Sequence, residues 1–264
     1  MTAIQMTPPM PSFLKLLAHE LRWQLVSALA HGDRRGQELA GLLGRPQNLV
    51  SYHLKRLRQA RLVTEHRSAA DRRDIYYSLR LDEMQSLFFA SGQALHPALG
   101  QTAGEPVAAP DVAVGGAPTR VLFLCTHNSA RSQMAEAITR HLGKGEVEVY
   151  SAGNEPSEVN PLAIETMRRR GISIDGQRSK HLSEFIGQRF DYVVTVCDVA
   201  RESCPVFPGS PERIHWSFPD PAAVTEAKAR RRAFDRTATE LTTRINYLLL
   251  VIRRQRSGGK QTGR

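Results

Sequence analysis

The sequence has few cysteines, and none of them lies among its first 124 residues. Cys125, Cys197 and Cys204 are the three cysteines of a 264-residue chain. A small, odd number of thiols argues against the disulfide framework of small secreted domains. The cysteines therefore remain available for catalysis, metal binding or core packing, all in the second part of the chain.

Long apolar segments are also missing. No window approaches the roughly 18 to 20 apolar residues that a membrane span needs. The start of the sequence lacks the basic stretch and apolar run of a signal peptide. We therefore expect a cytoplasmic protein with no membrane partner.

The chain has fewer acidic than basic residues. The chain has 36 Lys and Arg against 26 Asp and Glu, which gives a formal net charge of +10. Such an excess favours a polyanionic partner. The positive charge lies in both parts of the chain, however, and a domain that processes oxyanions would also be basic. Charge alone therefore does not locate a nucleic-acid site.

Residues 97–118 lack Lys, Arg and apolar periodicity, and they are rich in Ala, Gly and Pro. This composition predicts a linker. It separates a first domain at residues 1–96 from a second domain at residues 119–254. We expect a frayed basic tail from Arg253, with residues 255–264 lying outside the second domain.

Helical patterns dominate the first domain. Leucines between Leu14 and Leu29 recur every three or four residues, which predicts one apolar helix stripe. A short helix at residues 36–43 ends in a turn, and Pro46 opens the next helix as its first residue. The helix after Pro46 has a polar outer face, on which Gln and Asn can bond adenine edges and Arg can bond guanine or phosphate. Its predicted DNA contacts are Gln47, Asn48, Ser51, Tyr52, His53 and Arg56.

Two strands, near residues 62–66 and 75–79, enclose a charged tip, and a helix over residues 82–95 follows. At the tip, Arg67, Arg72 and Arg73 can meet phosphates or a minor groove. A short helix, a tight turn, a polar helix and a β-wing form the layout of a winged helix-turn-helix. The alternative is a polar helix face in a protein–protein module.

The segment ELAGLLGRPQNLVSYHLKRLRQARLV and the wing RRDIYYSL resemble the ArsR-type family of metalloregulatory repressors over residues 12–95. The resemblance implies binding of double-stranded DNA as a homodimer, with the first and last helices in the interface. The cysteine pair of arsenic-sensing members is missing, since residues 38–42 read ELAGL. The histidines of this part show no ligand spacing. We therefore predict no metal site and expect them to be surface or capping residues.

After the linker, strands and helices alternate. The run RVLFLC is typical of a buried parallel strand, and VEVYSAG, DYVVTV and RIHWSF predict further strands. Helices are expected at residues 130–142, 161–170 and 222–254. The alternation predicts an α/β domain with a small parallel sheet, beside a mainly α first domain.

Cys125 ends the first of these strands, and Arg131 and Ser132 open the helix after it. In this C-x5-R-S arrangement, loop N–H groups and the helix N-terminus form a nest for a tetrahedral dianion. The same field favours a nucleophilic thiolate, and the Arg fork can grip two oxygens. The alternative is a core cysteine at a strand end. The predicted oxyanion loop comprises Thr126, His127, Asn128, Ser129, Ala130 and Ser132. Of these, Ser132 is expected to hold the thiolate by a hydrogen bond and Asn128 to brace the loop.

Three further residues carry chemistry in this domain. Asp220, held by Pro221, suits a general acid or a helix N-cap, and these two roles are compatible. Cys197 and Cys204 are seven residues apart, which is unusual for metal ligands but suits a redox pair. On one helix their Cα atoms would lie about 10.5 Å apart, whereas a disulfide needs about 4.4–6.8 Å. Pairing would therefore require this segment to unwind or loop.

The segments CTHNSARSQMAEA, VYSAGNEP, VTVCDVARESCPVFPG and HWSFPDPA resemble, in this order, the thioredoxin-coupled arsenate reductases over residues 119–252. The resemblance implies the fold of low-molecular-weight protein tyrosine phosphatases. Those phosphatases share Cys125, Arg131 and an Asp like Asp220, but typically lack a cysteine pair. They also usually have an aromatic residue where this chain has Ala222.

The resemblance implies an arsenate reductase with a three-thiol relay and thioredoxin as partner. Cys125 attacks arsenate held by Arg131, Asp220 protonates the leaving oxygen, and Cys197 and then Cys204 carry the disulfide. No cofactor is required, although some members bind a potassium ion near the loop, and Asn128, Glu136 and Ser151 fit that site. Two alternatives stay open: a phosphotyrosine phosphatase fused to the regulator, and a regulator whose second domain is only a sensor.

Overall fold

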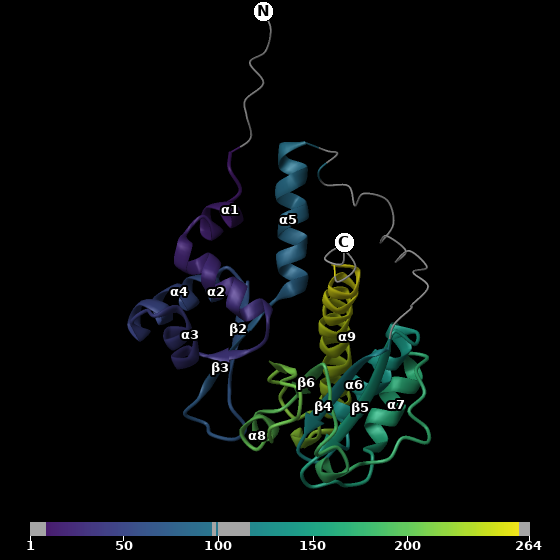
Figure 1. The fold of residues 1–264 in the computed structure, drawn as a ribbon. Coiled ribbons are helices and arrows are strands. Elements are labelled where there is room, and N and C mark those ends of the chain that lie inside the picture. The colour runs from purple at the N-terminus through teal and green to yellow at the C-terminus, as the bar shows by residue number, and fades with distance from the viewer. Residues whose placement is uncertain (1–8, 97–98, 100–116, 259–264) are drawn as a thin grey trace, which may run out of the picture. The chain divides into compact units, whose positions relative to one another are not determined.

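The computed structural model describes residues 9–96, 99 and 117–258 (Figure 1). Nearly all of the predicted linker at 97–118, and residues 259–264 of the predicted tail, lie outside this range. The chain divides into two compact units, formed by residues 1–66 with 74–115 and by residues 67–73 with 116–264. The domain boundaries drawn from the sequence stay a prediction.

The first unit is mainly helical, with a small three-stranded sheet. The sheet has the order β1-β3-β2, and β1 pairs with β3 in antiparallel fashion. Leu25, Leu39, Leu54 and Leu57 are buried in the core between the helices and this sheet. Its elements are α1 (Ser12–Leu17), α2 (Glu20–Ala30), β1 (Arg34–Arg35), α3 (Gly36–Leu43), α4 (Gln47–Gln59), β2 (Val63–Arg67), β3 (Ile75–Leu79) and α5 (Leu81–Leu95).

The leucine stripe predicted as one helix is divided between α1 and α2, so that expectation was wrong. The chain leaves the helical conformation at Ala18 (ψ 38°) and is extended at His19 (φ −135°, ψ 122°). Arg22 donates hydrogen bonds from its guanidinium to the carbonyls of Leu16 and Lys15. These bonds satisfy carbonyls that the end of α1 leaves without a helical partner, which makes the break tolerable.

Pro46 is the N-cap of α4 rather than its first helical residue. It has an extended backbone (φ −56°, ψ 137°), and α4 begins at Gln47. The inward face of α4 is as predicted, because Val50, Leu54 and Leu57 are buried.

The second unit is an α/β domain with a four-stranded sheet in the order β5-β4-β6-β7. All neighbouring strands are parallel, so the predicted fold class of this part is confirmed. Its elements are β4 (Thr119–Cys125), α6 (Arg131–Gly143), β5 (Val147–Gly153), α7 (Pro161–Arg169), the 3-10 turn η2 (Leu182–Glu184), β6 (Tyr192–Thr195), α8 (Asp198–Glu202), β7 (Glu212–His215), the 3-10 turn η3 (Pro221–Ala223) and α9 (Ala227–Gly258).

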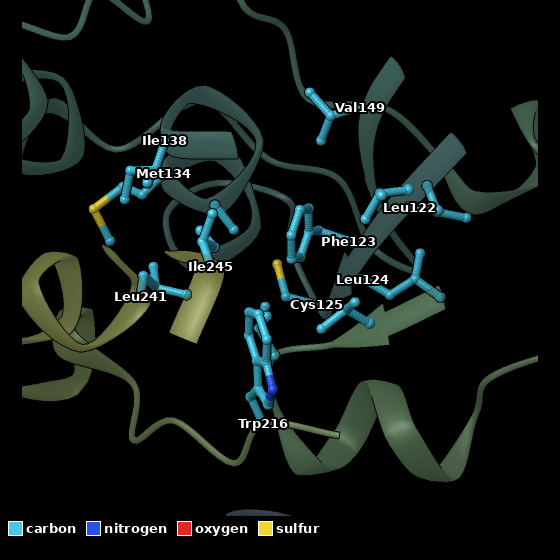
Figure 2. Close-up of a cluster of buried hydrophobic side chains, with 14 of the residues drawn as sticks. Leu122, Phe123, Leu124, Cys125, Met134, Ile138, Val149, Trp216, Leu241 and Ile245 are labelled. Carbon is cyan, nitrogen blue, oxygen red and sulfur yellow. The ribbon is translucent and has the colours of Figure 1, made fainter. Parts of the chain in front are cut away.

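Strand β4 lies inside the sheet and is buried from Val121 to Cys125. Helices α6 and α9 pack against one another over the sheet. Figure 2 shows the resulting core: Phe123 from β4 and Trp216 after β7 lie with Met134 of α6 and Leu241 of α9. A strand covered on both faces requires an unbroken apolar run, and this explains the sequence VLFLC.

The strand order places Cys125 at a switch point of the sheet. From β4 the chain crosses to β5 on one side, and it then returns to β6 on the other side. In open α/β sheets, ligands bind outside the carboxyl ends of the strands at such a point. The loop after Cys125 therefore occupies the position that the topology favours for a site.

Helix α9 differs from its predicted bounds at both ends. It starts at Ala227, after the turn η3, and it runs to Gly258 rather than ending near Arg254. Arg253 donates to Glu146 Oε2 (2.7 Å), and Arg256 donates to the Glu146 carbonyl (2.8 Å). These bonds hold the helix where fraying was expected. Within the described residues, no helix combines the length and apolarity that crossing a membrane requires.

Candidate active site

The thiol of Cys125 lies beneath the loop that joins β4 to α6. It is buried, and its sulfur accepts a hydrogen bond from the backbone N–H of Asn128 (3.1 Å). Ser132 Oγ, in the first turn of α6, lies 2.8 Å from the sulfur. A loop amide, a hydroxyl and a helix N-terminus therefore converge on one sulfur atom. Such groups stabilise negative charge there and suit a nucleophilic thiolate.

Asn128 holds this loop in shape. Its backbone is left-handed (φ 45°), a conformation that Asn adopts more readily than most residues, and its side chain is fully buried. Nδ2 donates to Ser132 Oγ and to Ser151 Oγ (2.8 Å each). Oδ1 accepts from the N–H of Lys180 (2.8 Å) and from Gln133 Nε2 (3.0 Å). The bracing role predicted for Asn128 thus agrees with its contacts.

A close backbone approach constrains the other side of the loop, and no sequence pattern predicted it. At Gly153, the last residue of β5, a Cβ atom would lie 2.5 Å from the carbonyl oxygen of Thr126. Only glycine fits without displacing the loop. The chain after β5 then follows the loop, since Glu155 N–H donates to the Thr126 carbonyl (2.9 Å) and the Glu155 carbonyl lies 3.1 Å from His127 Nδ1.

Arg131 opens α6 and is almost fully buried. Its Nη1 donates to the carbonyl of Phe218 (2.9 Å), and its Nη2 lies 3.6 Å from Asp220 Oδ2. The other carboxylate oxygen of Asp220 accepts from Ala222 N–H (3.1 Å) at the start of η3. Asp220 therefore caps this turn and also faces Arg131. The structure thus brings Asp220 next to the arginine that opens the helix after the Cys125 loop, as the sequence predicted.

Cys197 lies close to the same loop. It is the N-cap of α8, where its sulfur accepts from Ala200 N–H (3.4 Å) and lies 3.4 Å from Thr126 Oγ1. Burial raises the pKa of the Cys197 thiol; the positive charge of Arg131 lowers it in part, and Cys125 raises it further. The contact with Thr126 thus places the second thiol against the loop that follows the first.

Cys204 lies beyond the other end of α8 and is half-buried. Burial raises the pKa of its thiol, and the nearby guanidinium of Arg213, 3.7 Å from the sulfur, lowers it in part. All three thiols are free. Helix α8 runs from Asp198 to Glu202, so Cys197 directly precedes the helix and Cys204 follows its C-cap, Ser203. The need for unwinding on pairing stays a prediction.

A buried polar network next to Cys197 escaped the sequence reasoning. The carboxylate of Asp198 lies 3.1 Å from His215 Nε2 and accepts a hydrogen bond from Ser217 Oγ. His215 Nδ1 lies 2.8 Å from Thr195 Oγ1. Burial acts to raise the pKa of Asp198, but hydrogen bonds from His215 and Ser217 outweigh it, and the pKa is lowered to about 2. An ionised aspartate is thus fixed at the first residue of α8.

The residues proposed for a potassium ion do lie together, but they do not fit a bound cation. Glu136 Oε2 accepts from Ser151 Oγ (2.5 Å) and from the ammonium of Lys180 (3.2 Å). The second carboxylate oxygen accepts from Arg140 (2.5 Å). The oxygens of Asn128, Glu136 and Ser151 are therefore already engaged, and an ion would have to displace the lysine.

In the first unit, five of the six residues predicted to read DNA from α4 are exposed: Gln47, Asn48, Ser51, Tyr52 and Arg56. His53 is an exception. It is 4% exposed, and its ring centroid lies 4.4 Å from that of His19. Burial, together with the charges of His19 and Arg22, lowers its pKa. Residue 53 follows Val50 by three positions on the inward face, so His53 is neither a surface residue nor a DNA contact.

At the wing tip, Arg72 and Arg73 are exposed, as their predicted role requires. Arg73 is bound by Asp71, with its NH2 2.7 Å from Oδ2. Arg67 donates to the carbonyl of Arg72 (3.0 Å). Arg72 therefore has the freer guanidinium for a phosphate.

A parallel α/β unit with a buried thiol, an arginine and a loop amide at its switch point has the architecture of the low-molecular-weight phosphatases. Residues 120–258 match the family model described as low molecular weight phosphotyrosine protein phosphatase. This match spans more than half of the chain, and the chain belongs to that family. Residues 19–65 match the model of the bacterial regulatory proteins of the arsR family.

Relatives of the second part are named arsenate reductases. One from Shouchella clausii is 42% identical over 126 residues, which is 47% of this chain and 91% of the relative. One from Bacillus subtilis is 40% identical over 126 residues, with the same coverage of both chains. A solved structure of an arsenate reductase in its oxidized state is 30% identical and covers 51% of this chain and 98% of its own, with a TM-score of 0.46. Both resemblances drawn from the motifs are confirmed.

Proposed function

We propose that the second part of the chain reduces arsenate to arsenite through a relay of three thiols, and that the first part is an ArsR-type regulator that binds DNA. One observation carries the enzymatic proposal. Cys197 is the N-cap of α8, 3.4 Å from a residue of the oxyanion loop, and Cys204 lies just beyond the C-cap of the same short helix. A phosphatase needs only Cys125, whereas this arrangement supplies a second and a third thiol.

In the first step, the Cys125 thiolate attacks the arsenic of arsenate. Arg131 and the loop amides hold the oxyanion, and Asp220 gives a proton to the oxygen that leaves as water. In the second step, Cys197 attacks the sulfur of Cys125. The arsenic–sulfur bond breaks toward arsenic, which takes two electrons and leaves as arsenite, while a Cys125–Cys197 disulfide forms.

In the third step, the Cys204 thiolate attacks the sulfur of Cys197 and frees Cys125. The resulting Cys197–Cys204 disulfide is then reduced by a dithiol protein through exchange, and we propose thioredoxin for this role. Exposed Val206 and Val199 lie on either side of Cys204, so the last disulfide forms next to accessible surface. Such a cycle requires a reducing compartment, which agrees with a cytoplasmic location.

The proposal is tested by turnover of arsenate and of an aryl phosphate, each with and without thioredoxin and its reductase. The intact chain should reduce arsenate continuously only with the thioredoxin system present. The variant Cys204→Ser should stop after one turnover with arsenate but keep its aryl-phosphate hydrolysis, because that hydrolysis uses Cys125 alone. Sustained arsenate turnover by Cys204→Ser would exclude the relay.

The same assay tests the second candidate, a phosphotyrosine phosphatase. Membership of the phosphatase family and the pairing of Arg131 with Asp220 favour this candidate. It predicts fast aryl-phosphate hydrolysis that is indifferent to the loss of Cys197 or Cys204, together with no arsenate turnover.

For the first part, the exposed polar face of α4 and the match to the arsR family support binding of double-stranded DNA. We further propose a homodimer, with α1 and α5 in the interface. Exposed Phe88, Phe89 and Leu95 on α5 supply apolar surface of the kind that such an interface would cover.

A further inference from the structure

The ammonium group of Lys180 lies next to the buried residues that hold the oxyanion loop in shape. Lys180 lies in the irregular segment between α7 and η2, and its side chain is only 13% exposed. Its Nζ lies 3.2 Å from Glu136 Oε2 and donates to the Arg178 carbonyl (3.2 Å). Its backbone N–H donates to Asn128 Oδ1. One residue therefore contacts both the buried acid of α6 and the asparagine that shapes the loop.

These contacts extend in an unbroken chain to the nucleophile. From Glu136, the chain of hydrogen bonds passes through Ser151 (2.5 Å) to Asn128 (2.8 Å) and then to Ser132 (2.8 Å). The hydroxyl of Ser132 lies 2.8 Å from the sulfur of Cys125. Every link between Glu136 and the sulfur is buried. Polar groups connected in a dry interior polarise one another and keep one geometry.

The buried carboxylate of Glu136 needs a positive partner. An unpaired carboxylate in the interior is strongly unfavourable, and its negative charge would also oppose a thiolate at the other end of the chain. Arg140 meets one carboxylate oxygen, but its side chain is 55% exposed and solvent screens its charge. Lys180 meets the other oxygen, which is the one that Ser151 binds.

From this geometry we infer that the ammonium of Lys180 replaces a bound monovalent cation and positions the oxyanion loop through Glu136 and Asn128. The reaction of Cys125 is therefore independent of potassium. The ammonium binds Glu136 Oε2, the carboxylate oxygen that a dissolved potassium ion would need at this site. Lys180 touches neither substrate nor the reacting sulfur, and it is therefore a positioning residue.

The inference rests on the proposed nucleophilic role of Cys125, but not on arsenate being the substrate. It is tested by the rate at which iodoacetamide alkylates Cys125, measured across pH. All proteins carry Cys197→Ser and Cys204→Ser, so that a single thiol reacts. Neither arsenate nor thioredoxin is present, and failure here is therefore distinct from failure of the proposed relay.

Each protein is measured in potassium chloride and in N-methylglucamine chloride at equal ionic strength. The parent should give one pH profile in both salts. With Lys180→Met, the midpoint should rise by about one pH unit in both salts, a decrease of up to about tenfold in the reactive fraction below the midpoint. With Lys180→Ala, the rise should appear in N-methylglucamine and largely disappear in potassium, because the shorter side chain leaves room for the ion.

Lys228→Met is the matched control, because Lys228 is exposed near the start of α9, and it should leave the profile unchanged. A potassium effect on the parent would overturn the inference. So would a Lys180→Met profile equal to that of the control, or a lack of recovery of Lys180→Ala in potassium.

A further variant separates charge from folding. If Lys180 acts by compensating the carboxylate, the double variant Glu136→Gln, Lys180→Met should regain the parent midpoint, because both charges are gone. Circular dichroism and the thermal midpoint establish that each variant is folded. If Lys180→Met alone does not fold, the double variant carries the test. A folded double variant whose midpoint stays displaced would show that only the packing of the lysine stem matters and would refute the assignment.

Discussion

Replacing Asp198 by Asn removes a buried charge from the first residue of α8, next to Cys197. The pKa of this carboxyl is lowered from 3.8 to about 2 by hydrogen bonds that outweigh its burial. That difference corresponds to about 2 kcal/mol of folding free energy at neutral pH, at about 1.36 kcal/mol for each pH unit. We therefore expect Asp198→Asn to lower the free energy of unfolding by about 2 kcal/mol at pH 7.

The stabilisation by Asp198 should depend on pH. Because the folded pKa lies below the unfolded one, the stabilisation is complete above about pH 4 and is lost as the pH falls through about 2. The difference between the parent and Asp198→Asn should therefore narrow to roughly 1 kcal/mol near pH 2.5.

The assay is urea unfolding followed by the fluorescence of Trp216, which is buried against Phe123. A Trp23→Phe background leaves Trp216 as the sole tryptophan of the chain. Asp175→Asn is the control, since Asp175 is 67% exposed and lies 3.8 Å from Arg168; it should change stability by less than about 0.5 kcal/mol. An Asp198→Asn deficit that is the same at pH 7 and pH 2.5 would refute the electrostatic reasoning.

Two further predictions concern the helix between the resolving thiols and the face of α4. Oxidation of Cys197 with Cys204 should raise amide hydrogen exchange over residues 200–205, because we expect a disulfide between the two residues that flank α8 to unwind part of this segment. Unchanged protection in a protein whose disulfide is confirmed by mass would contradict this. The full chain should bind duplex DNA with an affinity that falls steeply with salt, as phosphate neutralisation requires. Gln47→Ala should relax sequence preference, whereas Arg72→Ala should weaken binding to all sequences alike. Salt-independent binding, measured by fluorescence anisotropy, would contradict these expectations.

The sequence by itself determined the features that depend on residues close together in the chain. The apolar run that ends at Cys125, followed at a fixed distance by Arg131, predicts a strand, an oxyanion loop and a helix start, because each depends on residues close together in the chain. The same holds for the alternation of strands and helices and for the inward stripe of Val50, Leu54 and Leu57 on α4. Local order also made the spacing of Cys197 and Cys204 informative before any fold was known.

Periodicity was less reliable where a single residue decided the outcome. The leucine stripe continues across Ala18 and His19, yet the backbone breaks there, because the side chain of Arg22 can bind the carbonyls that the break exposes. His53 lies on the inward face of α4, three positions after Val50, although its polar side chain suggested the outer face. Its ring packs against that of His19, which directly precedes α2.

Tertiary structure alone decided which distant residues support the site. Lys180 reaches Glu136 across 44 positions of sequence, and His215 reaches Asp198 across 17. Gly153 meets the carbonyl of Thr126 only because β5 pairs in register beside β4. A lysine, a glycine or a histidine has no local pattern that announces such a partner. Their roles arise when the parallel sheet brings its carboxyl ends to one edge, where burial turns ordinary charges and backbone contacts into strong constraints.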